Sequence, residues 1–273
     1  MKRRKMYIEN CAPSITRKQD TNKHSSCYTP KDMKRLKAKF NKTRRHKIVA
    51  TKSEEIWADI ADKTNCIRES CFATTLNEQP LQFTPKQPHT WAKNPTSWLS
   101  STDIELVLKQ YKSGYPEFNY IGPSPADFHV KKNGQCVWND LCNFSLEEQL
   151  AMGHTKIGIV FNIDVDSGPG MHWVAIFIDM SVKKFYYFDS TGNSIHNEKH
   201  IYKFYELVKK QDKSYTLTEN YPVEHQFGNT ECGIYSIFFI VTMLKTSNFK
   251  LFTNKNTFPD KEMVRLRTKY FNL

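Results

Sequence analysis

The sequence predicts an α+β protein of one main domain, preceded by a small, basic, mainly helical region. Three observations support this fold class. Segments with helical spacing come first, β-branched and aromatic runs follow, and further helical segments come last. The segment from Ile234 to Leu244 is apolar on every side, which predicts a helix buried in the core. Positive charge is concentrated in residues 1–52, which hold 17 Lys and Arg but 3 Asp and Glu, a balance of +14 in a chain of net charge +12.

The size and the cysteine pattern restrict the class of protein further. At 273 residues and 32.0 kDa, the chain can bury a sizeable core without disulfide support. Its seven cysteines are odd in number and scattered, which does not indicate a secreted disulfide framework, and no CxxC pair with matching partners indicates structural zinc. No signal-peptide region follows the basic N-terminal residues, and the longest apolar run is shorter than the roughly 18–20 residues that span a bilayer. We therefore expect a soluble protein of a reducing compartment, without a cofactor.

The first predicted domain covers residues 1–83. Apolar residues at helical spacing predict one helix between Lys31 and Lys47, and a second from a capping box at Thr51 and Glu54 to Cys71. Four prolines between residues 80 and 95 then mark the entry into the second domain, residues 84–273. The charge of residues 1–52 should attract a polyanion such as nucleic acid, an acidic protein surface or anionic lipid. A solvated basic tail without a specific partner is the alternative.

The second domain begins with helices and continues with strands. Trp98 and Leu99 precede a helix with capping-box spacing at Thr102 and Glu105. Residues 114–143 are rich in Gly, Pro and Asn, which predicts loops or short elements, and a short helix capped by Ser145 and Glu148 follows. The remaining elements are expected in this order: strands at Lys156–Ile163, His172–Asp179 and Lys184–Asp189, a helix at Lys199–Lys210, an edge strand at Tyr215–Thr218, and helices from Cys232 onward and at Asp260–Tyr270.

The buried helix opens with Cys232. A cysteine in the first turn of a helix experiences the positive end of the helix dipole, which favours thiolate over thiol. Gln226, six residues earlier, brings a side-chain amide near the same helix start, so the pair has the chemistry of a nucleophile and an oxyanion donor. A cysteine in an apolar helix is more commonly an inert small hydrophobic residue, so this interpretation depends on partners elsewhere in the chain.

A histidine and an aspartate supply those partners. His172 begins one predicted strand and Asp189 ends the next, so an antiparallel hairpin would bring them to the same edge of the sheet. A carboxylate there would fix the imidazole tautomer and support an imidazolium that pairs with a thiolate. Rival histidines exist, although none lies between a Gly-Pro-Gly loop and a buried strand as His172 does. They are His154, His196, His200 and His225.

These residues follow one another in an order that resembles a known family. The order is His172-Trp173, Asp189, Gln226 and Cys232-Gly233. It is similar to the cysteine protease clan of the ubiquitin-like-protein (SUMO-specific) proteases and the adenovirus protease, whose pattern has the same separations of 17 residues from His to Asp and six from Gln to Cys. The match covers about residues 95–250. It implies a mixed sheet packed by helices, with a central buried helix that carries the catalytic cysteine. The basic chain and its N-terminal extension most resemble the polyprotein-processing branch of the clan, found in African swine fever virus.

By that resemblance, the site residues take defined roles. Cys232 is the nucleophile, His172 the general base, Asp189 its orienting partner and Gln226 an oxyanion donor, while Trp173 covers the substrate channel. The implied activity is that of a cysteine endopeptidase that cleaves viral polyproteins after Gly-Gly during virion maturation, in the host cytoplasm and the virion. Three alternatives stay open: a protease that deconjugates ubiquitin-like proteins, an acetyltransferase of the same clan, and a non-enzymatic basic protein that binds nucleic acid.

Overall fold

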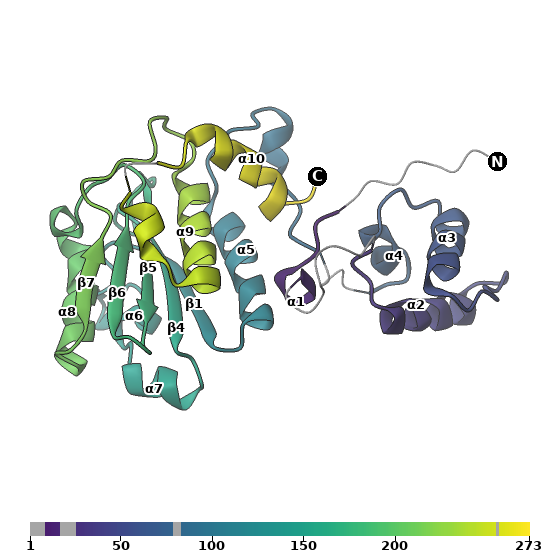
Figure 1. The fold of residues 1–273 in the computed structure, drawn as a ribbon, viewed down its shortest axis with the longest axis horizontal. Helices are drawn as coiled ribbons and strands as arrows, with labels where there is room; N and C mark the ends of the chain where they lie inside the picture. The colour runs from purple at the N-terminus through teal and green to yellow at the C-terminus, as the bar shows by residue number, and fades with distance from the viewer. Residues whose placement is uncertain (1–8, 17–25, 79–82, 255–256) are drawn as a thin grey trace. The chain divides into compact units, whose positions relative to one another are not determined.

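The computed structural model describes residues 9–16, 26–78, 83–254 and 257–273, which fall into two compact units (Figure 1). The larger unit comprises Pro88–Thr268. The smaller unit combines Met1–Gln87 with Lys269–Leu273, so nine residues that were predicted to lie in the second domain, 84–87 and 269–273, belong to the smaller unit. None of the helices in the described ranges is long and apolar enough to cross a membrane.

A five-stranded mixed sheet forms the centre of the larger unit. Its strands lie in the order β1-β4-β5-β6-β7, and the two outer pairs are parallel while the two inner pairs are antiparallel. The predicted α+β class with a mixed sheet is therefore confirmed. The strands are β1 (Phe118–Pro125), β4 (Lys156–Asn162), β5 (Trp173–Asp179), β6 (Lys184–Phe188) and β7 (Thr216–Glu219), and a separate short hairpin consists of β2 (Lys131–Lys132) and β3 (Gln135–Cys136).

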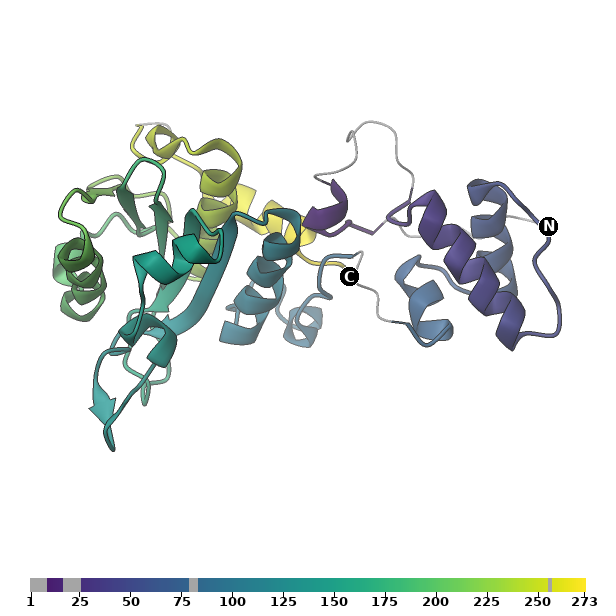
Figure 2. The ribbon, with the colours of Figure 1, turned by 90° about the horizontal axis from the view of Figure 1, so that it is seen from below.

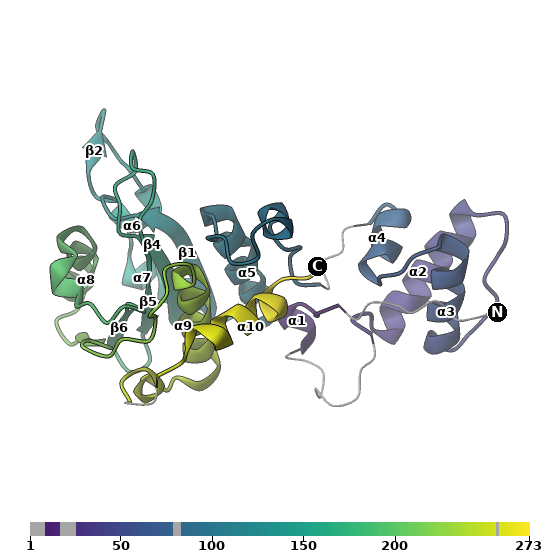
Figure 3. The ribbon, with the colours of Figure 1, turned by 90° about the horizontal axis from the view of Figure 1, so that it is seen from above.

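Helices cover both faces of this sheet (Figure 3). One face packs against α8 (Lys199–Gln211), whose Phe204 lies in a buried cluster with alternate residues of β4, β5 and β6. Two shorter helices, α6 (Asn139–Cys142) and α7 (Leu146–Ala151), complete that layer. On the opposite face lies α9 (Cys232–Thr246), beside α5 (Ser101–Gly114). α9 thus packs against the sheet in the core, as the apolar sequence of this helix predicted.

Close packing fixes the position of α9 on the sheet. The rings of Phe239 in α9 and Phe188 in β6 stack with their centroids 4.9 Å apart. A Cβ atom at Gly158 in β4 would lie 3.0 Å from Cγ2 of Ile240, so the absence of a side chain there lets the helix approach the strand. Most α9 residues are fully buried. The first residue of this helix, Cys232, is thereby held at a defined place above the sheet.

The elements of the larger unit differ from the sequence prediction in two places. The box that caps α5 is formed by Ser100 and Asp103 rather than Thr102 and Glu105. β1 lies in the region for which the sequence predicted loops or short elements. The strand was not predicted because it contains a glycine and prolines. The remaining elements of the larger unit are η1 (His89–Ala92), η2 (Ile195–Asn197), η3 (Phe249–Phe252) and α10 (Asp260–Tyr270), whose last two residues fall in the smaller unit.

The smaller unit consists mainly of helices (Figure 2). They are α1 (Pro13–Thr16), α2 (Pro30–Thr43), α3 (Ser53–Thr64) and α4 (Ser70–Thr75). The predicted second helix is therefore two helices, and α3 begins after Lys52 without the side-chain cap expected from Thr51. Apolar residues of α2, α3 and α4 share one buried cluster. Asn272 also belongs here, since its carbonyl accepts a 2.7 Å hydrogen bond from the backbone N–H of Gln87.

Six of the seven cysteines form disulfides. The pairs are Cys11–Cys27, Cys66–Cys71 and Cys136–Cys142. The expectation that the cysteines form no disulfide framework is wrong, because the fold brings together cysteines that are at most 16 residues apart. The assignment to a reducing compartment loses its main support with it. Cys232 is the free cysteine, and it is buried.

Candidate active site

A short hydrogen bond joins His172 to Asp189. The antiparallel pairing of β5 with β6 brings the residue before β5 and the residue after β6 to one edge of the sheet. There Nε2 of His172 lies 2.7 Å from Oδ1 of Asp189. Asp189 is buried and the His172 side chain is 16% exposed. The sheet edge therefore presents an imidazole that is bound to a desolvated carboxylate, as the hairpin predicted.

Two further residues hold Asp189 in place. Thr191 donates to Oδ1 of Asp189 from its backbone N–H at 2.9 Å and from its hydroxyl at 2.8 Å. The side-chain amide of Asn220 binds the backbone of Asp189 on both sides, with its Nδ2 donating to the carbonyl and its Oδ1 accepting from the N–H. Thr191 thus fixes the carboxylate of Asp189, and Asn220 fixes its backbone.

The environment of His172 favours the imidazolium. Burial of the ring lowers its pKa, but the hydrogen bond with Asp189 and the interaction with Cys232 outweigh burial and raise the pKa from 6.5 to about 10. Because Nε2 faces Asp189, Nδ1 is the ring nitrogen left to interact with Cys232. An imidazolium in this position stabilises a thiolate.

Cys232 is the first residue of α9 and is 2% exposed. The first N–H groups of a helix have no intrahelical acceptor, so they direct positive partial charge toward the cysteine sulfur and the space in front of it. The next residue, Gly233, packs so closely that an added Cβ would lie 3.1 Å from Leu99 and 3.4 Å from Trp173. The first turn of α9 therefore packs directly against the side chains of Leu99 and Trp173.

Gln226 is buried, and both ends of its side-chain amide are bound. Oε1 accepts a 2.7 Å hydrogen bond from the hydroxyl of Ser190, the residue after Asp189. Nε2 donates to the carbonyl of Gly228 at 3.0 Å, and one amide hydrogen remains for another acceptor. Since Ser190 fixes the oxygen end, the NH₂ end points into the loop that leads to Cys232.

Two tryptophans near the site, Trp173 and Trp98, differ in exposure. Trp173 is 6% exposed, and its indole N–H donates to the carbonyl of Leu99 at 3.1 Å. Trp98 is 47% exposed, and its indole N–H donates to the carbonyl of Asn229 at 2.7 Å. Trp173 therefore supports the helix start from inside, whereas Trp98 presents an aromatic surface beside the loop before Cys232.

The rival histidines lie in other environments. His154 contacts Gln149, His200 contacts His129, and His225 binds the carbonyl of Phe252. His196 packs against Tyr202. In the described part of the chain, His172 is the histidine that forms an ion pair with a carboxylate. The same residues contain no group of three or more His, Cys, Asp or Glu arranged to hold a metal ion.

Several residues that hold the site together carry no local signal in the sequence. Ser190 and Asn220 bind Gln226 and Asp189, and Arg267 binds Glu231, the residue before the free cysteine. Each of these contacts joins residues 31 to 36 positions apart. No local pattern reveals such pairs, so only the folded chain identifies them.

Comparison with known proteins gives consistent matches. Residues 155–273 match the model of the Ulp1 protease family, C-terminal catalytic domain. The chain is 30% identical over 201 residues to a cysteine protease of the Malawi tick isolate of African swine fever virus, covering 66% of this chain and 70% of that protein. It is 32% identical over 181 residues to a thiol protease of Acanthamoeba polyphaga mimivirus, covering 64% of this chain but only 57% of that relative.

The fold is also similar to that of a solved structure. The crystal structure of the African swine fever virus protease superposes with a TM-score of 0.65 at 23% sequence identity. The alignment covers 98% of this chain and 97% of the other, so both units take part in the similarity of fold.

Proposed function

The chain belongs to the Ulp1 protease family of cysteine proteases, and on that basis we propose that it is an endopeptidase that cleaves viral polyproteins after Gly-Gly. The observation that carries this proposal is the 2.7 Å His172–Asp189 pair, which interacts with the free cysteine at the first residue of α9. A buried carboxylate that binds an imidazole, which in turn interacts with a thiol, provides a nucleophile together with its base.

The proposed reaction proceeds through a thioester. The Cys232 thiolate attacks the scissile carbonyl carbon, a C–S bond forms, and the carbonyl π electrons move to oxygen. Collapse of this intermediate breaks the C–N bond as the His172 imidazolium donates its proton to the leaving amine. The neutral imidazole then takes a proton from water, whose oxygen attacks the thioester. Breaking the C–S bond releases the carboxylic acid product and restores the thiolate–imidazolium pair.

Gln226 is proposed to stabilise the oxyanion. Its remaining amide hydrogen and the backbone N–H of Cys232 are the donors. The Ser190 hydroxyl holds the amide oxygen, so the NH₂ group does not have to reorient when negative charge develops on the substrate oxygen. Donors that are fixed before the reaction are worth more than those that reorganise during it.

The proposed preference for glycine before the cleaved bond has a steric reason, namely the aromatic side chains near Cys232. Trp98 is exposed beside the loop that precedes Cys232, and Trp173 packs against the helix start. A backbone that passes between such rings and the nucleophile has little room for a Cβ atom, and glycine alone lacks one. The same geometry suits the C-terminal Gly-Gly of a ubiquitin-like protein. Some relatives from African swine fever virus carry the name SUMO-1 cysteine protease, so deconjugation is the second candidate function.

Cleavage of peptides tests this proposal. Peptides of the form Gly-Gly-X, incubated with the wild type and with Cys232→Ser, are analysed by mass spectrometry. We expect cleavage after the second glycine by the wild type and none by the variant. Formation of an acetyl-enzyme from acetyl-CoA, without peptide cleavage, would instead identify an acetyltransferase of the same clan. Cleavage of a ubiquitin-like precursor, in preference to the peptides, would favour deconjugation.

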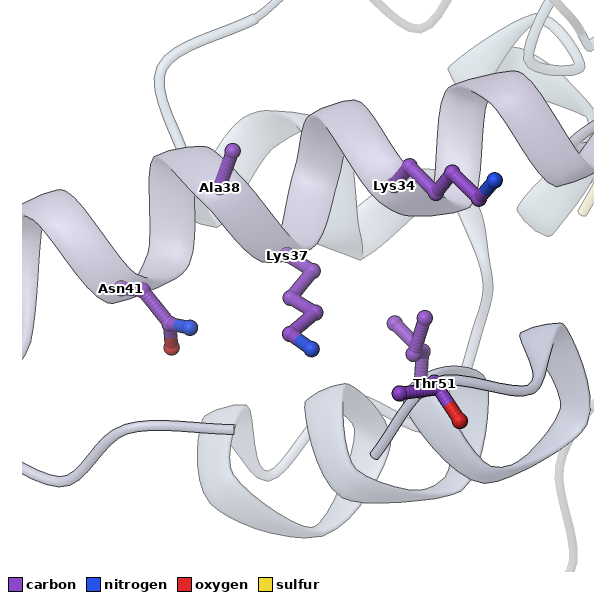
Figure 4. A pocket seen from close by; sticks show the side chains of 6 residues that line it. Lys34, Lys37, Ala38, Asn41 and Thr51 are labelled. Atoms are coloured by element: carbon purple, nitrogen blue, oxygen red, sulfur yellow. The ribbon is translucent and has the colours of Figure 1, made fainter. Parts of the chain in front are cut away.

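The basic N-terminal region is proposed to bind a polyanion. A pocket on α2 is lined by two lysines together with small and polar residues (Figure 4); its lining is Lys34, Lys37, Ala38, Asn41, Thr51 and Ile56. Lys34 is exposed, while the ammonium of Lys37 donates to the carbonyls of Val49 and Ala50. A positive surface of this kind attracts phosphates in a salt-dependent manner.

Binding to DNA at increasing salt tests the polyanion proposal. We expect Lys34→Gln to weaken binding and to reduce the salt dependence, whereas Lys210→Gln in α8 of the larger unit is a control that leaves both unchanged. Equal binding by wild type and Lys34→Gln would remove this pocket from the interaction.

A further inference from the structure

We propose that α10 is a positioning element of the active site, with Asp260 and Arg267 holding the two ends of the loop from Gln226 to Glu231. This inference rests on the proposed function. That function makes Gln226, at one end of the loop, the oxyanion donor, and makes Cys232, directly after the other end, the nucleophile. Neither residue touches the substrate in this proposal. Both act through the loop backbone and through Glu231.

Asp260 holds the end of the loop next to Gln226. One carboxylate oxygen, Oδ2, accepts hydrogen bonds from the backbone N–H groups of Phe227 at 3.1 Å and Gly228 at 2.8 Å. The carbonyl of Gly228 in turn accepts the bond from Nε2 of Gln226. Asp260 therefore fixes Gly228, the residue whose carbonyl orients the donating end of the glutamine amide.

The second oxygen of Asp260 is also engaged in the core. Oδ1 lies 3.0 Å from the hydroxyl of Tyr235, a buried residue one turn after Cys232 in α9. The same hydroxyl lies 2.9 Å from the carbonyl of His225, the residue before Gln226. One carboxylate thus connects the loop to the helix that carries the nucleophile.

Arg267 holds the other end of the loop. Its Nε donates to Oε2 of Glu231 at 2.8 Å, and both side chains are 3% exposed. Its two terminal nitrogens donate to the carbonyls of Ser97, Thr96 and Thr230, and the guanidinium lies over the ring of Trp91 at 4.5 Å. The planar fork of arginine matches this set of acceptors, which the single ammonium of lysine does not.

Two charged side chains of α10, the half-buried Asp260 and the buried Arg267, thus bind a segment of six residues. Glu231 forms no side-chain cap to α9, so its carboxylate is directed to Arg267 rather than to the helix start. A loop that carries an oxyanion donor must keep it within a few tenths of an ångström of its working position, since a displacement of about 1 Å can cost about 10²-fold in rate. The two contacts from α10 supply that restraint from outside the catalytic residues.

A kinetic double-mutant cycle tests this proposal. Asp260→Ala, Gln226→Ala and the double variant are assayed for kcat and KM on a Gly-Gly peptide, together with the rate of Cys232 alkylation by iodoacetamide. We expect Asp260→Ala to lower kcat by about 10²-fold with KM within about twofold. The double variant should be no slower than Gln226→Ala alone, because Asp260 acts through the glutamine. Alkylation builds no oxyanion and should stay within about twofold of wild type in each case.

The controls separate a positioning role from a structural one. Glu262→Ala removes a carboxylate on the same helix that pairs with the exposed Arg265, and it should leave kcat unchanged. Asp260→Asn retains an oxygen for the loop N–H groups and should recover most of the lost kcat. If Asp260→Ala does not fold, Asp260→Glu displaces the loop by one methylene and carries the same expectation.

Two results would overturn the proposal. One is a wild-type kcat in Asp260→Ala and Asp260→Glu, and the other is a double variant whose loss of kcat is the product of the two single losses. A wild type that does not cleave the peptide would reject the proposed function instead, so the two failures are distinguishable.

Discussion

Nε2 of His172 lies 2.7 Å from Oδ1 of Asp189, and the two residues flank neighbouring antiparallel strands, His172 directly before β5 and Asp189 directly after β6. The pair is therefore placed by the main-chain register of β5 and β6 rather than by a flexible loop. Thr191 also fixes the carboxylate of Asp189, and Asn220 fixes its backbone. A rigid acid–imidazole pair of this kind holds the ring in one orientation while protons move through its other nitrogen.

Cys232 should be the single reactive thiol of the native protein. Six cysteines are paired in disulfides, so incubation with iodoacetamide at neutral pH without reductant should add one label to the wild type and none to Cys232→Ala. Cys232→Ala should also abolish peptide cleavage while the fold is retained. Intact-protein mass spectrometry measures the labels, and circular dichroism checks the fold. More than one label in the native wild type would contradict the pairing.

Gln226→Ala should lower kcat by roughly 10²–10³-fold with little change in KM. The amide contact with the oxyanion forms only in the transition state, so substrate binding does not report it. Ser190→Ala should cause a smaller loss of kcat, because it frees the amide oxygen but leaves the donor in place. Steady-state kinetics on one glycine-containing peptide compares both variants with the wild type. A near wild-type kcat for Gln226→Ala would remove this residue from the mechanism.

The stabilising effect of the His172–Asp189 pair should decrease as pH rises. The pKa of His172 is about 10 in the folded protein and 6.5 in the reference state, so its contribution is complete below pH 6.5 and is lost as pH rises through 10. Asp189→Asn should therefore lower the free energy of unfolding by about 3–5 kcal/mol at pH 6 and by progressively less toward pH 10. Urea denaturation of both proteins at matched pH gives this difference. A difference that is constant from pH 6 to pH 10 would argue against the pair as its source.

Removing one partner of the Glu231–Arg267 pair should destabilise the larger unit. Both side chains are buried, so Arg267→Met leaves an uncompensated carboxylate and should cost about 3–5 kcal/mol in the free energy of unfolding. Glu231→Gln in the same chain should recover part of that loss, because an amide replaces the unpaired charge. Arg265→Met, on the exposed side of the same helix, is the control and should fall within about 0.5 kcal/mol of wild type. Urea denaturation measures all four proteins.

The sequence allowed the elements around the site to be predicted because their signals are local. Apolar continuity identified α9, and β-branched and aromatic runs identified β4, β5 and β6. The approach of His172 to Asp189 followed from the hairpin between the last two strands. Helix caps were less predictable, since Ser100 with Asp103 and Thr102 with Glu105 satisfy the same rule.

The features that escaped prediction depend on contacts between distant segments. β1 is interrupted by Gly122 and two prolines, and its strand conformation depends on pairing with β4. The disulfides depend on which cysteines the fold brings together. In the sequence, Asp260 and Arg267 belong to a predicted exposed helix of mixed charge. No local sequence pattern distinguishes them from Glu262 and Arg265 on the same helix.

The position of residues 269–273 has a consequence for synthesis of the protein on the ribosome. They belong to the unit formed by residues 1–87, and Asn272 bonds to Asn10 and Gln87. Chains emerge from the N-terminal side, and domains generally fold as units. The buried cluster around Leu36 and Phe72 is complete early, but this last segment arrives only after the whole larger unit has been translated. The smaller unit thus begins to emerge before the larger unit, and its residues 269–273 emerge after it.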